Sequence, residues 1–228
     1  MNRLSISIAL AASLAGSAIA AGKDDVAKRL DESATVLSEV MGTPDKAIPN
    51  DLLEKAHCIV IVPGLKKGAF IVGGKYGKGF ISCRRQGHSG WSAPGAVRVE
   101  GGSFGFQIGG SETDVIMLVM NQRGADRLLQ SKFTLGGDAE VAAGPVGRNT
   151  SAQTDAKMTA EILSWSRSRG LFAGVSLQGA TLREDSDDNF ALYGEKLHNS
   201  DIITKWHAPS AEAGSLLRLL KQYSPREL

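Results

Sequence analysis

Glycine interrupts almost every apolar run in the middle of this chain, and no other feature constrains its fold so strongly. From Phe80 to Tyr193 short apolar segments are separated by glycines, and the whole chain holds 27 of them in 228 residues. Glycine inside a strand marks a bulge, a bend in a barrel or the close approach of two backbones. The pattern therefore predicts a tightly curved sheet, although it says little about chemistry.

Helical patterns flank this region. Amphipathic helices are expected over residues 24–41 and 210–223, because apolar side chains recur there at helical spacing. Short helices are expected from Pro49 and from Asn121, which can cap a helix that ends near Gln130. Strands are expected at residues 58–62, 69–73, 79–84, 96–100, 104–109, 114–120, 140–143 and 170–182, with a hairpin around Lys75 and Tyr76. We therefore expect an α+β fold, in which a curved antiparallel sheet or partly closed β-barrel carries packed helices from both ends of the chain.

Several glycine motifs form a recognisable series when they are read in order. They are Gly90-Trp91-Ser92-Ala93-Pro94 and the segments 101–109, 144–148, 166–179 and 189–194. Together they resemble the SYLF family of lipid-binding domains, which includes yeast actin-patch proteins, over roughly residues 45–200. The resemblance points to a bacterial secreted member, and it implies a non-enzymatic lipid-binding domain.

The first twenty residues are typical of a secretory signal peptide. Arg3 supplies the positive start, Ile6 to Leu14 form a short apolar run, and Ala18-Ile19-Ala20 offers small residues for cleavage. The predicted organisation is a signal peptide at 1–20, an N-terminal amphipathic helix at 21–44 and a single SYLF-like domain at 45–228. We expect a periplasmic or secreted protein after cleavage near Ala20, and a retained membrane anchor is the alternative.

The N-terminal helix is one candidate for membrane contact. In eukaryotic relatives of the SYLF type, an amphipathic segment at the start of the domain takes part in membrane binding. Here the candidate membrane-facing stripe consists of Val26, Leu30, Leu37 and Met41. The polar face mixes acids with bases, whereas membrane-surface helices are usually rich in Lys and Arg there. A helix packed on the domain's own sheet is therefore the favoured alternative.

A long stretch of the chain contains bases and no acids. Between Lys55 and Val99 there is neither Asp nor Glu, although the whole chain is nearly balanced, with 26 basic and 24 acidic residues. Six of these bases form the candidate lipid-binding patch: Lys66, Lys67, Lys75, Lys78, Arg84 and Arg85. If strands bring them to one surface, each contributes about 1 kcal/mol of attraction to an anionic membrane. Alternatively, they point apart and keep strand edges soluble.

The only two cysteines, Cys58 and Cys83, lie in or beside predicted strands. An exported protein reaches a compartment that permits disulfides, so a bridge is a candidate if the two strands are neighbours. Two buried thiols that behave as small apolar side chains are the alternative.

Motifs for catalysis or metal binding are weak. Gly101-Gly102-Ser103-Phe104-Gly105 matches G-x-S-x-G, but the residues after it continue as a strand instead of opening a helix. The acidic segment 184–188 reads as a solvated hairpin tip, since it lacks the regular spacing of a calcium loop. We expect no enzymatic activity, no catalytic residue, no cofactor and no metal.

The expected function is that of a secreted or periplasmic lipid-binding domain, which acts at an anionic membrane surface through a basic face. Anionic phospholipid or lipopolysaccharide is the expected partner, an envelope protein is a further candidate, and nucleic acid is not expected. The alternative is a cell-envelope protein-interaction or structural module that binds an acidic protein or polysaccharide.

Overall fold

The computed structural model describes most of the chain. The described residues are 4–43, 47–70, 72–84, 90–104, 109–130, 132–144, 160–168, 171–172, 177–205 and 207–225. Within these ranges, no helix has both the length and the apolar character needed to cross a bilayer.

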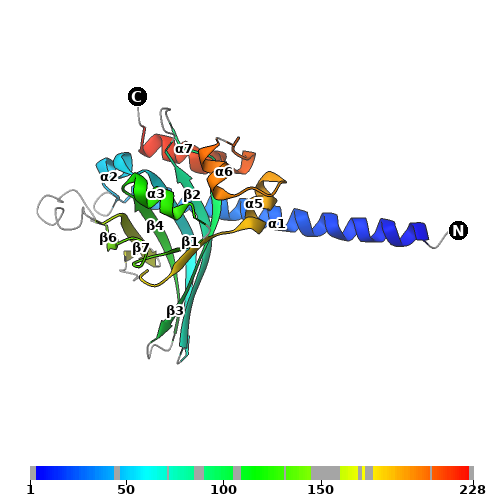
Figure 1. Ribbon diagram of the computed structural model, residues 1–228, viewed down its shortest axis with the longest axis horizontal. Helices are drawn as coiled ribbons and strands as arrows, with labels where there is room; N and C mark the ends of the chain where they lie inside the picture. The colour runs from blue at the N-terminus through cyan, green and yellow to red at the C-terminus, as the bar shows by residue number, and fades with distance from the viewer. Residues whose placement is uncertain are drawn as a thin grey trace, which may run out of the picture.

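One sheet organises the described residues (Figure 1). Its strands are β1 (Cys58–Phe70), β2 (Val72–Cys83), β3 (Gly95–Phe104), β4 (Gly109–Val119), β5 (Lys132–Thr134), β6 (Val141–Ala143), β7 (Ile162–Ser168), β8 (Leu171–Phe172) and β9 (Thr181–Glu184). They lie in the order β5-β9-β3-β2-β1-β4-β7-β6, with β8 paired to β7. Every pair is antiparallel except β6 with β7, which is parallel.

Helices from both ends of the chain pack on this sheet, which confirms the expected α+β class. They are α1 (Leu4–Met41), α2 (Asn50–Lys55), α3 (Gln122–Leu128), α5 (Ser186–Tyr193), α6 (Asn199–Thr204), the 3-10 turn η1 (Ala211–Ala213) and α7 (Gly214–Tyr223). As expected, the side chain of Asn121 caps α3 by accepting a hydrogen bond from the Gly124 amide.

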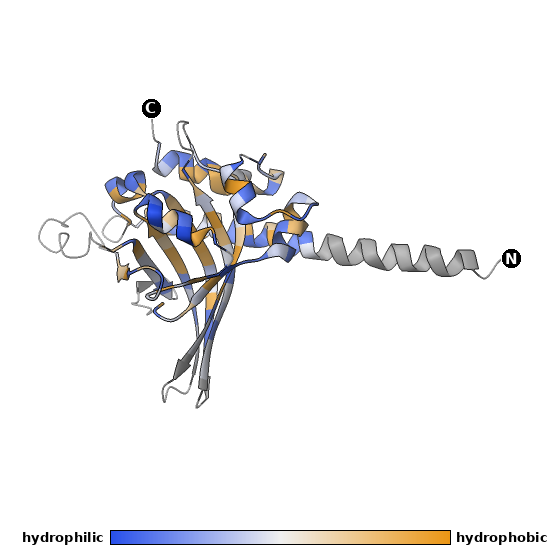
Figure 2. Cartoon of the chain, in the orientation of Figure 1, coloured by the Kyte–Doolittle hydropathy of each residue, from blue (hydrophilic) through white to orange (hydrophobic). Residues whose placement is uncertain are grey.

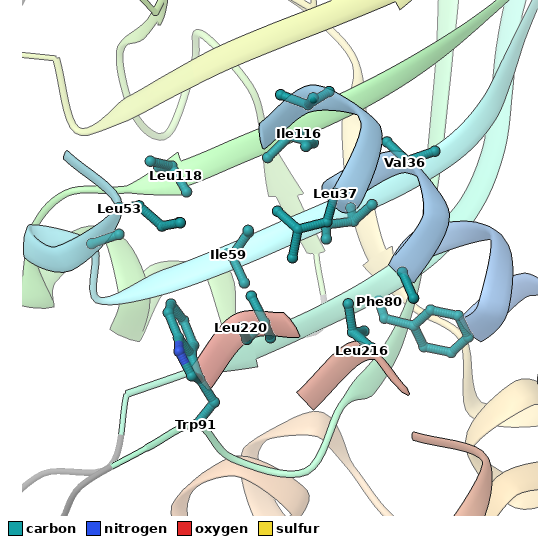
Figure 3. Close-up of a cluster of buried hydrophobic side chains, with 14 of the residues drawn as sticks. Val36, Leu37, Leu53, Ile59, Phe80, Trp91, Ile116, Leu118, Leu216 and Leu220 are labelled. Carbon is teal, nitrogen blue, oxygen red and sulfur yellow. The ribbon is translucent and has the colours of Figure 1, made fainter. Parts of the chain in front are cut away.

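Two apolar clusters sandwich the sheet because its central strands are apolar on both faces. On β1, Ile59 packs with Leu37 of α1 and Leu216 of α7 (Figure 3), and Ile61 belongs to the same cluster. Val60, at the intervening position, belongs to the second cluster with Phe133 of β5 and Leu182 of β9. Figure 2 shows hydrophobic residues, in orange, along the strands of the sheet beneath the helices. The core therefore holds both α1 and the curled strands in place.

Glycine permits the bend of the sheet, as the sequence predicted. β1 carries an irregularity between Val62 and Leu65, where Gly64 adopts a φ of 59°. Opposite the bend, Gly79 of β2 approaches β1 so closely that a Cβ would lie 2.0 Å from the Ile61 carbonyl oxygen. A side chain at Gly79 would push the two strands apart, and a side chain at Gly64 would be strained by the positive φ.

Beyond the bend, the outer halves of β1 to β4 extend away from the helices (Figure 1). We call this part, residues 66–70, 72–76, 100–104 and 109–112, the ribbon. One row across it is made of glycine alone: Gly110, Gly68, Gly74 and Gly102. The next row toward the body contains Ser111, Lys67, Lys75 and Gly101. The ribbon thus presents lysines beside exposed backbone.

Several local expectations are wrong. No turn lies at Lys75 and Tyr76, which are inside β2, because the pairing of β1 with β2 continues past them to Phe70 and Val72. The acidic segment at 184–188 is no hairpin tip: Asp185 caps α5, whose first turn holds Asp187 and Asp188. The strand expected at 104–109 falls largely on residues 105–108, which lie outside the described residues.

Candidate functional site

Three of the six predicted patch residues lie on the ribbon. Lys67 of β1 lies directly opposite Lys75 of β2 in the strand register. Lys66, the neighbouring residue, pairs with Tyr76 on one side and with Glu112 of β4 on the other. Because side chains alternate along a strand, Lys66 projects to the opposite face of the ribbon from Lys67.

Both facing lysines have lowered pKa values. Partial burial lowers the pKa of Lys67, and the charge of Lys75 lowers it further. Partial burial also lowers the pKa of Lys75. Like charges directly opposite each other in a sheet are unfavourable, so a bound anion would relieve this arrangement.

Lys78 does not join this group, which corrects the predicted patch. Its ammonium lies 2.8 Å from Asp185 and 2.9 Å from Asp188, and Arg29 of α1 also pairs with Asp188. Burial opposes the charge of Lys78, but the hydrogen bonds that its ammonium donates to both aspartates, together with their charges, outweigh burial and raise its pKa. The network ties β2 to α5 and α1, and Lys78 acts there as a structural residue.

Arg84 is also removed from the predicted patch, because it is only 8% exposed. Its guanidinium donates to the carbonyl oxygens of Ser224, at 2.9 Å, and Leu53, at 3.3 Å. Its central carbon lies 4.1 Å from the ring centroid of Trp91. These contacts anchor the end of α7 to α2 and the sheet. Arg85 lies outside the described residues.

The apolar stripe of α1 packs on the protein itself. Val26, Leu30 and Leu37 are 2%, 1% and 0% exposed, and Met41 is partly buried against the same cluster. Releasing them to a membrane would expose the core, so the candidate membrane stripe is corrected to the packed alternative. The polar face of α1 remains available.

Cys58 and Cys83 are joined by a disulfide in the structure. They are direct cross-strand partners at the start of β1 and the end of β2, and both are buried. The bridge closes the body end of the β1–β2 hairpin, at the opposite end from the ribbon.

An open groove of about 1080 Å³ separates α1 from the base of the ribbon. Its helix wall carries Asp31, Glu32 and Glu39, and its sheet wall carries Lys66, Lys67 and Glu112. At one end Arg167 of β7 pairs with Glu39 and, at 2.9 Å, with Asp114. These hydrogen bonds outweigh the burial that would lower the pKa of Arg167 and raise it instead.

The carboxylates of this groove were missed by sequence reasoning. The acids on the polar face of the N-terminal helix were the available signal, since they departed from the pattern of a membrane-surface helix. What the sequence did not reveal is that Glu112 and Lys66 pair across β4 and β1 and face that helix.

The G-x-S-x-G match has no catalytic geometry in the described residues. Ser103 lies inside β3 and its backbone pairs with Gly73 of β2. A nucleophile elbow requires a sharp turn from a strand into a helix at the serine. In the part of the chain that is described, no three His, Cys, Asp or Glu residues gather as a metal site.

Comparison with known proteins identifies similar chains. A family model described as "Ysc84: Las17-binding protein actin regulator" matches residues 100–223. The human "SH3 domain-containing YSC84-like protein 1" is 33% identical over 184 residues, which cover 80% of this chain and 53% of that protein. Its Xenopus laevis counterpart is 35% identical over 170 residues, covering 74% and 50%. The "LAS seventeen-binding protein 3" of Saccharomyces cerevisiae is 33% identical over 187 residues, covering 81% and 40%. The chain thus spans about half the length, or less, of these relatives.

Proposed function

Since this chain belongs to the Ysc84 (SYLF) family, whose members are named as binding and regulatory proteins, we propose that it is a non-enzymatic domain that binds an anionic membrane surface. The binding residues in this proposal are the ribbon lysines Lys66, Lys67 and Lys75. Anionic phospholipid or lipopolysaccharide is the ligand, and its phosphate groups are the atoms recognised.

The pairing of Lys67 with Lys75 is the observation that carries this proposal. Two like charges held opposite each other lower the stability of the free protein and favour any state in which an anion lies between them. Lys66 adds a third charge on the other face of the same ribbon. Such a projecting element can reach a membrane while the body of the protein stays in water.

The proposed location is the periplasm or the exterior of a bacterial cell. The signal-like composition of residues 1–20 supports it, and so does the disulfide between Cys58 and Cys83, since such bonds persist in oxidising compartments.

A protein partner is the second candidate, because the yeast relative is named for binding another protein. In this version, the ribbon lysines contact an acidic protein or polysaccharide of the cell envelope. The groove and the ribbon remain the contact surface, and only the identity of the anionic partner differs.

Co-sedimentation with vesicles tests the proposal. We expect the protein to pellet with phosphatidylglycerol vesicles and not with phosphatidylcholine vesicles at about 0.15 M salt, where screening acts over about 8 Å. The Lys67→Glu/Lys75→Glu variant should lose this binding. Lys196→Glu/Lys221→Glu is the matched control, because it makes the same charge change at exposed lysines of the helical side. Equal binding by both variants would contradict the assignment, and no binding at all would favour the protein partner.

A further inference from the structure

We propose that the groove between α1 and the ribbon holds a zwitterionic lipid headgroup with a phosphate and a primary ammonium, as in phosphatidylethanolamine. Lys66 binds the phosphate, and the carboxylates of Asp31 and Glu112 bind the ammonium. This inference rests on the proposed function and specifies the headgroup.

Both walls of the groove carry charged side chains. Lys66 and Lys67 stand on β1, while Asp31 and Glu32 stand on α1 across the opening. Glu112 of β4 lies beside Lys66 in the strand register, so the sheet wall offers both signs. A dipolar ligand can therefore satisfy both walls at once.

Some of the groove charges are already satisfied within the protein. Arg167 pairs with Glu39 and Asp114, and Lys28 lies 3.9 Å from Glu32. Among the described residues, Asp31, Glu112 and Lys66 enter no ion pair, and all three are exposed. These side chains are thus available to a ligand.

The carboxylates select against a purely anionic ligand inside the groove. Five acids line it, namely Asp31, Glu32, Glu39, Glu112 and Asp114, against the four bases Lys28, Lys66, Lys67 and Arg167. A phosphate without a cation would be attracted by Lys66 but would also be repelled by Glu112, its partner in the strand register. An attached ammonium turns that repulsion into attraction.

The lining also discriminates between kinds of ammonium. Quaternary ammonium groups are recognised by cages of aromatic rings. The described groove lining contains no aromatic side chain. Carboxylates instead suit a primary ammonium, which donates up to about three hydrogen bonds. The volume of about 1080 Å³ is also large enough for a headgroup and its glycerol unit.

Titration of the isotope-labelled full chain with soluble headgroups, followed by NMR, tests the site. We expect glycerophosphoethanolamine to shift amides at 31–39, 64–67 and 111–114, with an affinity about tenfold above that of glycerophosphocholine or glycerol 3-phosphate, the effect of one charge-assisted contact. Asp31→Asn/Glu112→Gln should abolish this preference. Asp51→Asn/Glu54→Gln on α2 is the control, since it removes two exposed carboxylates elsewhere. Equal response to the three compounds, or none, would overturn the inference.

A vesicle experiment separates this inference from the proposed function. At constant phosphatidylglycerol content, replacing phosphatidylcholine by phosphatidylethanolamine should raise vesicle binding of the wild type and leave Asp31→Asn/Glu112→Gln unchanged. If binding to phosphatidylglycerol persists without an ethanolamine effect, the headgroup assignment fails alone. If glycerophosphoethanolamine binds but anionic vesicles do not, the membrane-surface function fails and the groove stands as a binding site for a soluble headgroup.

Discussion

At the scale of single residues, the pair Lys67 and Lys75 shows a conflict between stability and binding. Their register on β1 and β2 forces two positive charges together, and burial makes each charge harder to keep. A lysine with a lowered pKa destabilises the folded state while it is charged. Under the proposed function, a bound anion would offset this cost.

We therefore predict that Lys75→Glu stabilises the free protein while it weakens vesicle binding. An opposite-charge pair replaces a like-charge pair, and the free energy of unfolding should rise by about 1 kcal/mol. Urea unfolding without lipid measures the stability, and co-sedimentation measures the binding. Lys221→Glu, on α7, should change neither. Loss of both stability and binding would mean that Lys75 supports the fold rather than a ligand.

Arg84 illustrates the opposite situation, a buried charge fully committed to structure. It bonds the carbonyl oxygens of Leu53 and Ser224 and stacks over Trp91. We predict that Arg84→Ala lowers the free energy of unfolding by about 3 kcal/mol, since it removes the charged donor of the Ser224 carbonyl and the packing of the guanidinium on Trp91.

Arg84→Lys should recover only part of the loss, because an ammonium lacks the planar fork that reaches both carbonyls. Urea denaturation compares the two variants. A loss below about 1 kcal/mol for Arg84→Ala would show that the end of α7 does not depend on this contact.

The basic residues could be identified from the sequence, but their partners in the folded protein could not. Lys67 and Lys78 stand next to glycines, and Arg84 follows a short apolar run, so the local sequence does not distinguish their roles. Their roles diverge because of residues far away: Asp185 and Asp188 approach Lys78, and Ser224 approaches Arg84. Such contacts depend on strand order, which local patterns do not encode.

At the scale of elements, the contact of β2 with α5 predicts a stability change at alkaline pH. Lys78 has a pKa raised above the ordinary 10.5 by its aspartate partners. The folded state therefore holds a proton that the unfolded state loses, and stability falls as pH rises above 10.5. Tyr193 of α5 acts in the same direction, because burial raises the pKa of its hydroxyl, which donates to the Pro94 carbonyl.

We predict that the melting temperature of the wild type falls above pH 10.5 and that Lys78→Met/Tyr193→Phe flattens this fall. Scanning calorimetry across that range measures it. Lys67 and Lys75, with lowered pKa values, act oppositely below pH 10.5, where their deprotonation favours the folded state. If the melting temperature of the double variant fell with pH as steeply as that of the wild type, the roles assigned to Lys78 and Tyr193 would be contradicted.

The glycine row of the ribbon offers a second prediction at this scale. At Gly68 and Gly74 a Cβ would meet nothing within 4 Å, so packing does not require glycine there. Gly68→Ala/Gly74→Ala should stabilise the protein by about 0.5–1 kcal/mol per site through reduced unfolded-state entropy. Gly79→Ala is the contrast, since its Cβ would collide with the Ile61 carbonyl. Thermal unfolding compares them, and equal destabilisation by both changes would reject the distinction.

Local patterns predicted some elements well. The helix at 24–41, the capped helix after Asn121 and the strand at 114–120 all have strong periodicity or a specific cap. β7 was not expected, because the alternating serine and arginine residues at its end are typical of a turn. Its pairing with β4 shows that the segment is a strand. α5 was read as a hairpin tip because its first turn is acidic, although acids also favour helix starts.

At the scale of the whole molecule, glycine content predicted the curved sheet and the terminal helices predicted the α+β class. The single-sheet order β5-β9-β3-β2-β1-β4-β7-β6 was not predictable, since it arises from pairings between segments far apart in the chain. The candidate site was predictable only in part for the same reason. Its lysines could be identified from the sequence, but the acids of α1 could be assigned to the groove only once the position of α1 was known.

We predict that the disulfide is a major source of global stability. Cys58 and Cys83 are 25 positions apart, and closing a loop of that length contributes about 3 kcal/mol. Cys58→Ala/Cys83→Ala should lose that amount in urea unfolding, and a reductant should reproduce the loss in the wild type. A reductant that also lowers the stability of the double variant would show that its effect is not the bridge.

The same bridge has a consequence for survival among proteases. Cys58 and Cys83 lie at the two ends of the β1–β2 hairpin, and the lysines of this hairpin are of the residue type that trypsin-like enzymes cleave after. A cut at Lys66, Lys67 or Lys75 would break the backbone without releasing a fragment, because the sulfur atoms still join both pieces. A nicked molecule would run as one band on a gel until the bridge is reduced. The ribbon, which carries the proposed binding residues, is thus a part of the protein that a single cut cannot detach.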